Sequence, residues 1–188
     1  MEQVVRNAFE IEVVFSGAQQ AEQQRQAEAR QKPKTQNPEA VTDKRITKRW
    51  TNEEMHRIGL MGEHGYSAVT GTPVDQECGL SGNLRGDFLE FEKWIEVKTL
   101  QGYLAFSTLR DFRADFAVLA IFKPGQWDRV WMQGWIPKGE FEQHHFVKNF
   151  GYGEKLCFAP KDLLPMTTLK THCYMAQKFN RVVRSLRG

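Results

Sequence analysis

Two carboxylates and one ammonium group stand close together near the middle of the 188-residue sequence. Asp87 is followed by Glu96, and Lys98 comes two residues after Glu96. Carboxylate oxygens are ligands that Mg²⁺ prefers, and this ion usually binds one or two carboxylates and keeps several water molecules. A bound divalent cation polarises a phosphodiester and lowers the pKa of its water, while a nearby lysine can orient that water or stabilise developing negative charge. The three residue types therefore favour metal-dependent hydrolysis.

A β-hairpin would bring these three groups together. If the chain turns at Phe91 and Glu92, Asp87 lies directly opposite Glu96, and opposed residues have Cβ atoms about 4.5–5.5 Å apart. Side chains two apart on a strand share a face, so we expect Asp87, Glu96 and Lys98 to converge on one face of the hairpin. The opposite face would carry apolar side chains that point into a core: Phe88, Ile95 and Val97.

The elements around this hairpin follow from the hydrophobic pattern. Strands are predicted at residues 88–91, 94–99, 116–122 and 130–136. The run 116–122 is apolar throughout, as expected of a strand buried on both faces. A short helix is expected at 107–113, and the alternation within residues 4–15 favours a further strand, although its first residues can also open a helix. Helix, strands, crossover and further strands predict an α/β domain with a mixed sheet.

A helix is predicted to begin just after Thr51 and to end at Gly65. Thr51 followed three residues later by Glu54 is a capping-box pattern, and apolar residues at helical spacing follow it: Met55, Ile58 and Met61. Gly65 is a plausible C-terminal stop. Residues 66–70 are then expected to form a short strand, before a turn-rich segment at 71–85.

At the central motif the chain resembles the PD-(D/E)xK nuclease superfamily, with Asp87 and then Glu96-Val97-Lys98 in the motif positions. The residue before Asp87 is Gly86 and not Pro, although many members lack the Pro. A further similarity is to archaeal-type Holliday junction resolvases, which carry a Glu on their first helix, eleven residues before a Gly-aromatic-x-x-Val turn into the first strand. Glu54 precedes Gly65-Tyr66-Ser67-Ala68-Val69 by that interval. The resemblance covers roughly residues 52–136, including closing strands at 116–122 and 131–135.

The resemblance implies a restriction-endonuclease-like fold, a mixed β-sheet flanked by helices, and Mg²⁺-dependent hydrolysis of phosphodiester bonds in DNA, with Mn²⁺ as a substitute. It implies that Asp87 and Glu96 bind the metal with the carbonyl of Val97, and that Lys98 positions the attacking water. Two interpretations of Glu54 stay open, as a further metal ligand and as the capping partner of Thr51. Structure-specific and site-specific cleavage stay open, as does DNA against RNA. The alternative function is a non-catalytic nucleic-acid-binding or assembly component that retains the fold.

Charge is unevenly distributed along the chain. Residues 1–50 carry a net charge of +2, residues 51–164 a net charge of −4, and residues 165–188 a net charge of +5. An acidic centre between basic ends favours a protein that holds a polyanion with its periphery; the alternative is a solvated surface with a basic tail. Phosphate contacts are expected from five arginines: Arg85, Arg110, Arg113, Arg181 and Arg184.

We divide the chain into an N-terminal segment and polar linker (1–49), a nuclease-like domain (50–164) and a basic C-terminal helix (165–188). Residues 17–49 are expected to be a linker or arm because the run from Gln19 to Lys34 lacks large apolar residues and has nothing to pack, even as a helix. The terminal helix has apolar residues at helical spacing from Leu169 to Leu186. Its basic side can contact phosphates, and its apolar stripe can equally pack on the core or form a homodimer.

Composition limits the class of protein. A hydrophobic content of 40% excludes a wholly disordered chain. No apolar stretch approaches the roughly 18 residues of a membrane span, and the N-terminus does not resemble a signal peptide. Three widely spaced cysteines without a CxxC motif do not indicate a disulfide scaffold or a zinc site. We therefore expect a cytoplasmic protein that does not bind a membrane, and the resemblance implies DNA as its partner.

Overall fold

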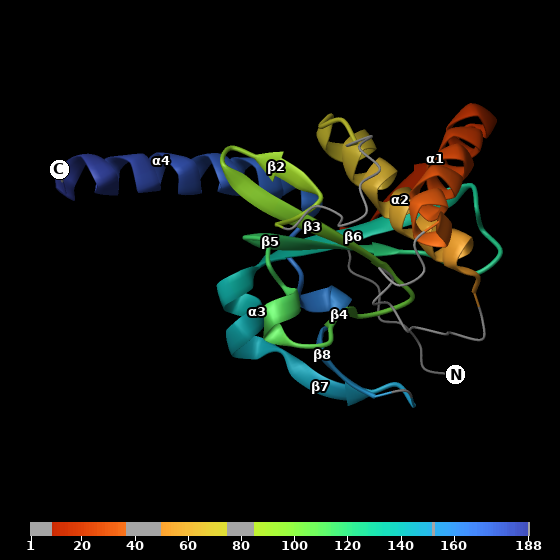
Figure 1. Ribbon diagram of the computed structural model, residues 1–188. Coiled ribbons are helices and arrows are strands. Elements are labelled where there is room, and N and C mark those ends of the chain that lie inside the picture. Colours follow the sequence, from red (N-terminus) through yellow and green to blue (C-terminus); the bar gives the residue numbers. More distant parts are fainter. Residues whose placement is uncertain (1–8, 37–49, 75–84, 152, 188) are drawn as a thin grey trace.

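A five-stranded mixed β-sheet lies at the centre of the protein (Figure 1). The computed structural model describes residues 9–36, 50–74, 85–151 and 153–187, and the side-chain surroundings of these residues except 31–36 and 183–187. The strand order is β1-β6-β5-β3-β2, in which only β3 and β5 run parallel to each other. The strands are β1 (Ile11–Val14), β2 (Phe88–Glu90), β3 (Lys93–Leu100), β5 (Phe116–Ile121) and β6 (Arg129–Pro137). The expectation of a mixed sheet flanked by helices is confirmed.

The central strand β5 is buried along its whole length. All six residues from Phe116 to Ile121 are buried, because β3 and β6 pair with its two edges and side chains cover both of its faces. One hydrophobic cluster contains Val118 and Ala120 and lies on one face of the sheet, and the other contains Ala117 and Leu119 and lies on the opposite face. The prediction of a doubly buried strand from a continuous apolar run is confirmed.

The hairpin of β2 and β3 has the register expected from the sequence. Phe88 pairs with Ile95 and Glu90 with Lys93, so the two-residue turn consists of Phe91 and Glu92. Both turn residues have positive φ angles, 47° and 65°, the conformation that a tight hairpin turn requires because it matches the twist of the strands. The register therefore brings Asp87 level with Glu96.

Two helices cover one face of the sheet, α1 (Gly17–Gln36) and α2 (Asn52–Thr70) (Figure 1). The prediction of a strand at residues 66–70 is wrong, because α2 continues through this segment and ends at Gly71, whose φ is +76°. Gly65 is buried within the helix, where a Cβ atom would lie 2.7 Å from Val130 Cγ1 and 2.8 Å from Met132 Sδ. The glycine thus permits close packing of the helix on β6 and does not end the helix.

Helix α1 differs from the expected linker, because residues 17–36 are helical and pack on α2. Ala27 and Gln23 are fully buried, and polar side chains join the two helices: Arg30 to Glu63, Gln26 to His64 and Gln24 to Glu53. Small and polar side chains supply this contact, so it leaves no pattern of large apolar residues in the sequence. The strand β1 before it pairs with β6, so the N-terminal part contributes to the sheet itself.

The other face of the sheet is covered by a smaller antiparallel sheet and short helices. The small sheet has the order β4-β8-β7, with β4 (Leu104–Phe106), β7 (Phe146–Asn149) and β8 (Glu154–Phe158). The short helices on this face are η2 (Leu109–Asp111), α3 (Lys138–His144) and η3 (Pro160–Asp162), whereas Met166 of η4 (Met166–Thr168) packs in the cluster on the α2 face. The chain passes from β3 to the parallel strand β5 through β4 and η2, without an α-helix. Only η2 of these elements was expected, within the helix predicted at 107–113.

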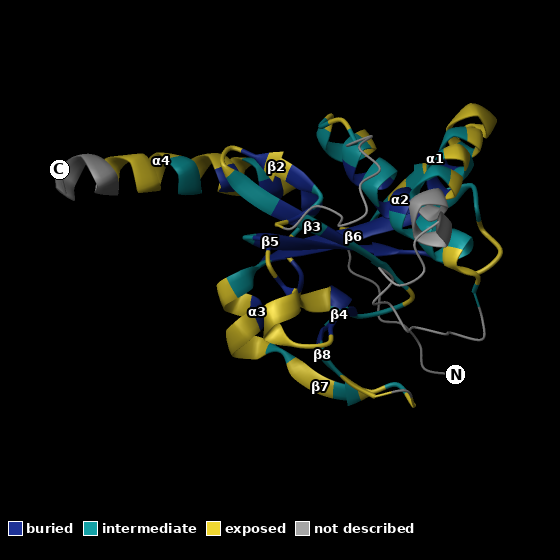
Figure 2. Ribbon diagram, viewed as in Figure 1, coloured by how far each residue is buried: buried dark blue, intermediate teal, exposed yellow. Residues whose placement is uncertain are grey.

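The C-terminal helix α4 (Leu169–Arg187) begins in the core and then extends away from the body of the protein (Figure 1). Leu169 and Cys173 are fully buried, whereas Met175 and Phe179 are 60% and 69% exposed. Figure 2 shows the change from buried to exposed along the helix. Among the side chains that the structure describes, the predicted apolar stripe therefore packs on the core at its start and becomes exposed by Phe179. None of the described helices is long and apolar enough to cross a membrane.

Candidate active site at the edge of the central sheet

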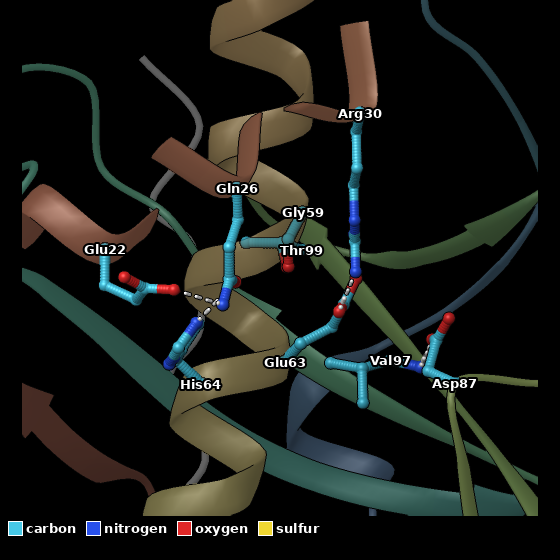
Figure 3. Close-up of polar contacts among 9 residues, drawn as sticks. All are labelled: Glu22, Gln26, Arg30, Gly59, Glu63, His64, Asp87, Val97 and Thr99. Carbon is cyan, nitrogen blue, oxygen red and sulfur yellow. Dashed lines mark hydrogen bonds and ion pairs between the residues drawn. The ribbon is translucent and has the colours of Figure 1, made fainter. Parts of the chain in front are cut away.

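Asp87 lies at the edge of β3, where the ladder between β2 and β3 ends. Its backbone N–H donates to the carbonyl of Ile95 at 2.7 Å, and its Oδ2 accepts a hydrogen bond from the Val97 N–H at 2.7 Å (Figure 3). The Asp87 carboxylate thus accepts the hydrogen bond that a backbone carbonyl would accept if β2 extended further along β3. Gly86 permits this approach, because a Cβ atom there would lie 2.8 Å from the carbonyl oxygen of Ile95.

Glu96 and Lys98 project from β3 on the face opposite α2. Val97, between them, is buried in the cluster beneath α2, and successive side chains of a strand point to opposite faces. Glu96 and Lys98 form an ion pair, and the Lys98 ammonium lies 5.2 Å from the centre of the Phe106 ring. The ammonium group is therefore held over β4 while a third of the side chain stays exposed.

A third carboxylate, Glu63 on α2, acts on Asp87 from the helical layer. Gly62 lies against β3, where a Cβ atom would be 3.2 Å from Val97 Cγ1 and closer still to Thr99. This close approach brings the next residue, Glu63, to the edge of the strand. Arg30 of α1 binds both Glu63 carboxylate oxygens at 2.8 Å (Figure 3). Glu63 was not predicted as a site residue, although a glycine before an acid on the helix is a signal of close packing.

The pKa of the Asp87 carboxyl is raised from 3.8 to about 7. Burial of the carboxyl is the largest cause, and the negative charge of Glu63 is the next. The hydrogen bond from Val97 opposes the rise, Glu96 adds to it, and Lys98 opposes it. Asp87, Glu96 and Lys98 are thus brought into one electrostatic environment, together with Glu63. A buried carboxylate beside like charges is a site where a cation would relieve repulsion.

The donor set at this edge fits a hard cation with a partly aqueous shell. Within the described residues, no group of three or more His, Cys, Asp or Glu side chains is arranged to hold a metal ion. Mg²⁺ does not need such a cage, because one or two carboxylates and several waters commonly bind it. Asp87 and Glu96 would supply the carboxylates. The Val97 N–H faces Asp87, and the N–H and C=O of one strand residue face the same neighbour, so its carbonyl faces this edge too.

Glu54 stands apart from these groups. Its carboxylate accepts from the Thr51 N–H at 2.7 Å, and its own N–H donates to Thr51 Oγ1 at 3.1 Å, which completes the capping box. Nine residues separate it from Glu63, a distance of about 13.5 Å along a helix. The structure therefore brings Glu63, and not Glu54, to Asp87. The Gly65–Val69 segment that linked Glu54 to the junction-resolvase pattern is helical.

The expected phosphate-binding arginines lie in three places. Arg85 and Arg113 line one pocket, at the starts of β3 and β5. Arg110 is exposed on η2 and does not line that pocket. Arg181 on α4 forms an ion pair with Glu92 at 3.0 Å. Arg184 belongs to α4, but its side chain lies outside the described residues.

Comparison with known proteins identifies no relative of this chain. No protein-family model, curated protein or solved structure matches it. Function is therefore inferred from the residues and their geometry.

Proposed function

We propose that this protein is a Mg²⁺-dependent nuclease with a restriction-endonuclease-like fold that hydrolyses phosphodiester bonds in DNA. The observation that carries the proposal is the hairpin register that sets Asp87 opposite Glu96, with Lys98 paired to Glu96 and Asp87 bonded to the Val97 N–H at the edge of β3. Carboxylates whose pKa is strongly shifted by burial and by specific neighbouring charges are found most often at functional sites. The assignment to DNA, and to PD-(D/E)xK enzymes, rests on the resemblance of the motif.

In this proposal Asp87, Glu96 and the carbonyl of Val97 hold the metal ion. The ion would supply Lewis acidity toward the phosphodiester and a water of lowered pKa. Lys98 orients the attacking water or stabilises the negative charge that develops on the phosphate; its contact with Phe106 keeps the ammonium in position. Glu63 raises the pKa of Asp87 and so strengthens the demand for a cation at this edge.

A second candidate function is a non-catalytic nucleic-acid-binding component, and one feature favours it. Each acidic group of the site has a partner within the chain: Arg30 binds Glu63, Lys98 binds Glu96, and the Val97 N–H binds Asp87. A site that is satisfied in this way can be stable without a metal ion. The two candidates differ in metal binding. Only a nuclease needs the Glu96 carboxylate to leave its ion pair with Lys98 and bind a metal ion.

The test is cleavage of linear duplex, single-stranded and branched DNA, and of RNA, by the full chain with Mg²⁺, Mn²⁺, Ca²⁺ or a chelator. We expect cleavage with Mg²⁺ and Mn²⁺ and none with the chelator. Lys98→Ala should lower turnover by about 10²–10³ fold, the usual effect of losing one group that stabilises transition-state charge. Lys161→Ala is the control, because Lys161 is exposed on η3.

Two results contradict the proposal. Full activity in the presence of the chelator would exclude a metal-dependent mechanism. Absence of cleavage on all four substrates, combined with no heat of Mg²⁺ binding in calorimetry, would favour the non-catalytic candidate. Circular dichroism of each variant separates a lost site from a lost fold.

A further inference from the structure

A cavity of about 580 Å³ opens at the end of the sheet where β3 and β5 begin. Its walls come from the segment before β2, from the starts of β3, β5 and α3, and from α4, which contributes Ala176. Figure 1 shows α3 beside this end of the sheet. The volume lies within the range of about 300–1,000 Å³ that is usual for small-ligand sites.

The walls of the cavity carry an excess of positive charge. Among the described residues, four cationic side chains line it, against the carboxylate of Asp115: Arg85, Lys93, Arg113 and Lys138. These cations come from four separate parts of the chain, so no single helix or strand face explains their convergence. Like charges gathered around one concave surface repel one another, and a bound anion would relieve that repulsion.

The Asp115 carboxylate is already engaged by the protein. Asp115 accepts from the Lys93 ammonium at 3.2 Å through Oδ1 and from the Trp94 N–H at 2.9 Å through Oδ2. Its carbonyl accepts from the Lys138 N–H at 2.9 Å. Asp115 therefore ties the starts of β3, β5 and α3 together and compensates Lys93.

The two arginines of the cavity are available to a ligand. In the described part of the chain, neither Arg85 nor Arg113 has an acidic partner, and both side chains are exposed. Lys138 has a distant contact with Glu142, at 4.0 Å, in which both side chains are more than a third exposed. Arginine presents paired N–H donors that match the oxygens of a phosphate.

We infer that this cavity binds a phosphate group, through Arg85 and Arg113 with Lys138 beside them. The assignment of that phosphate to a nucleic-acid strand rests on the proposed function. Lys93 at the cavity lies on β3 three residues before Glu96, about 10 Å along a strand, so the cavity and the candidate active site share this strand. The nucleic-acid strand proposed for Asp87 and Glu96 is therefore the nearest source of a phosphate for the cavity.

Binding is measured by calorimetry on the full chain without metal. The probes are inorganic phosphate, a short deoxyoligonucleotide with a 5′-phosphate, and the same oligonucleotide without it. We expect all phosphate-containing probes to bind. Tighter binding of the 5′-phosphorylated oligonucleotide assigns the cavity to a strand end, and equal binding of the two oligonucleotides assigns it to a backbone phosphate.

Arg113→Gln and Arg85→Gln should each weaken phosphate binding by about tenfold or more, as expected for a lost charge-assisted hydrogen bond. Arg110→Gln is the matched control, because Arg110 is exposed nearby in sequence and does not line the cavity. Ala176→Glu, which adds a carboxylate from α4, should weaken binding without the removal of any arginine.

Two outcomes overturn the inference: no binding of inorganic phosphate, or equal weakening by Arg110→Gln and Arg113→Gln, which would indicate general surface charge. The outcomes for the cavity and for the nuclease are distinguishable. Phosphate binding without cleavage by the wild-type protein would refute the nuclease alone. Metal-dependent cleavage that Arg85→Gln and Arg113→Gln leave unchanged, without phosphate binding, would refute the cavity alone.

Discussion

Replacement of Asp87 by Asn tests the electrostatics of the candidate site directly. The amide oxygen of Asn can still accept the hydrogen bond from the Val97 N–H, which is 2.7 Å from the carboxylate in the native protein. The substitution therefore removes the charge and keeps the contact that joins the segment before β2 to β3. A change in stability then reports the cost of the charge and not the loss of a hydrogen bond.

The expected magnitude follows from the raised pKa. The pKa of Asp87 rises from 3.8 to about 7 on folding, and one pKa unit corresponds to about 1.36 kcal/mol. Because the native protein holds this proton more tightly than the unfolded chain does, the stabilising contribution is complete below about pH 4 and is lost as the pH rises through 7. Wild-type protein should therefore lose on the order of 4 kcal/mol of unfolding free energy between these limits.

The assay is urea unfolding from pH 4 to pH 9, followed by tryptophan fluorescence, for wild type and Asp87→Asn. We expect similar stability at the acid end and a more stable variant at the alkaline end, together with loss of nuclease activity. Asp162→Asn is the control, because Asp162 is exposed on η3. Parallel pH profiles for wild type and Asp87→Asn would refute the argument that burial and Glu63 raise this pKa.

Two further predictions concern residues outside the site. Glu54→Ala should lower the free energy of unfolding by about 0.5–2 kcal/mol, as expected for a damaged helix cap, while cleavage is retained; loss of activity at an unchanged melting temperature would instead restore Glu54 as a ligand. Truncation after Ala176 keeps the buried residues Leu169 and Cys173 and removes most of the basic tail. It should weaken DNA binding and reduce the slope of log K against log salt by about 0.9 for each lost phosphate contact. An unchanged slope combined with a smaller oligomer in sedimentation would assign the exposed apolar stripe to self-association.

The sequence by itself determined the elements whose signals are local. The run from Phe116 to Ile121 predicted a strand buried on both faces, and the structure confirms it. The hairpin register also followed from the sequence, because a two-residue turn at Phe91 and Glu92 and a side-chain period of two permit only one pairing that buries Ile95. Since register decides which residues are opposed, the proximity of Asp87 to Glu96 was predictable as well.

Only the tertiary structure decided how the layers meet. Gly65 resembled a helix stop, yet it is a point of contact between α2 and β6, because a buried glycine and a terminal one look alike in sequence. A second glycine, Gly62, lies against β3, and this approach places Glu63, and not Glu54, beside Asp87. The packing of α1 on α2 uses Ala27 and polar side chains, which have no apolar periodicity to detect.

The convergence of distant segments was likewise beyond the sequence. Arg85 and Arg113 were expected to contact phosphate, but nothing in their spacing indicated that they share a cavity with Lys138 and α4. That arrangement depends on the parallel pairing of β3 with β5 and on Asp115, whose hydrogen bonds join both strands to α3. Local patterns specify strands, turns and opposed residues, because these depend on backbone geometry over a few positions. The charge environment of a site depends on which surfaces pack together, and that is decided by the folded chain as a whole.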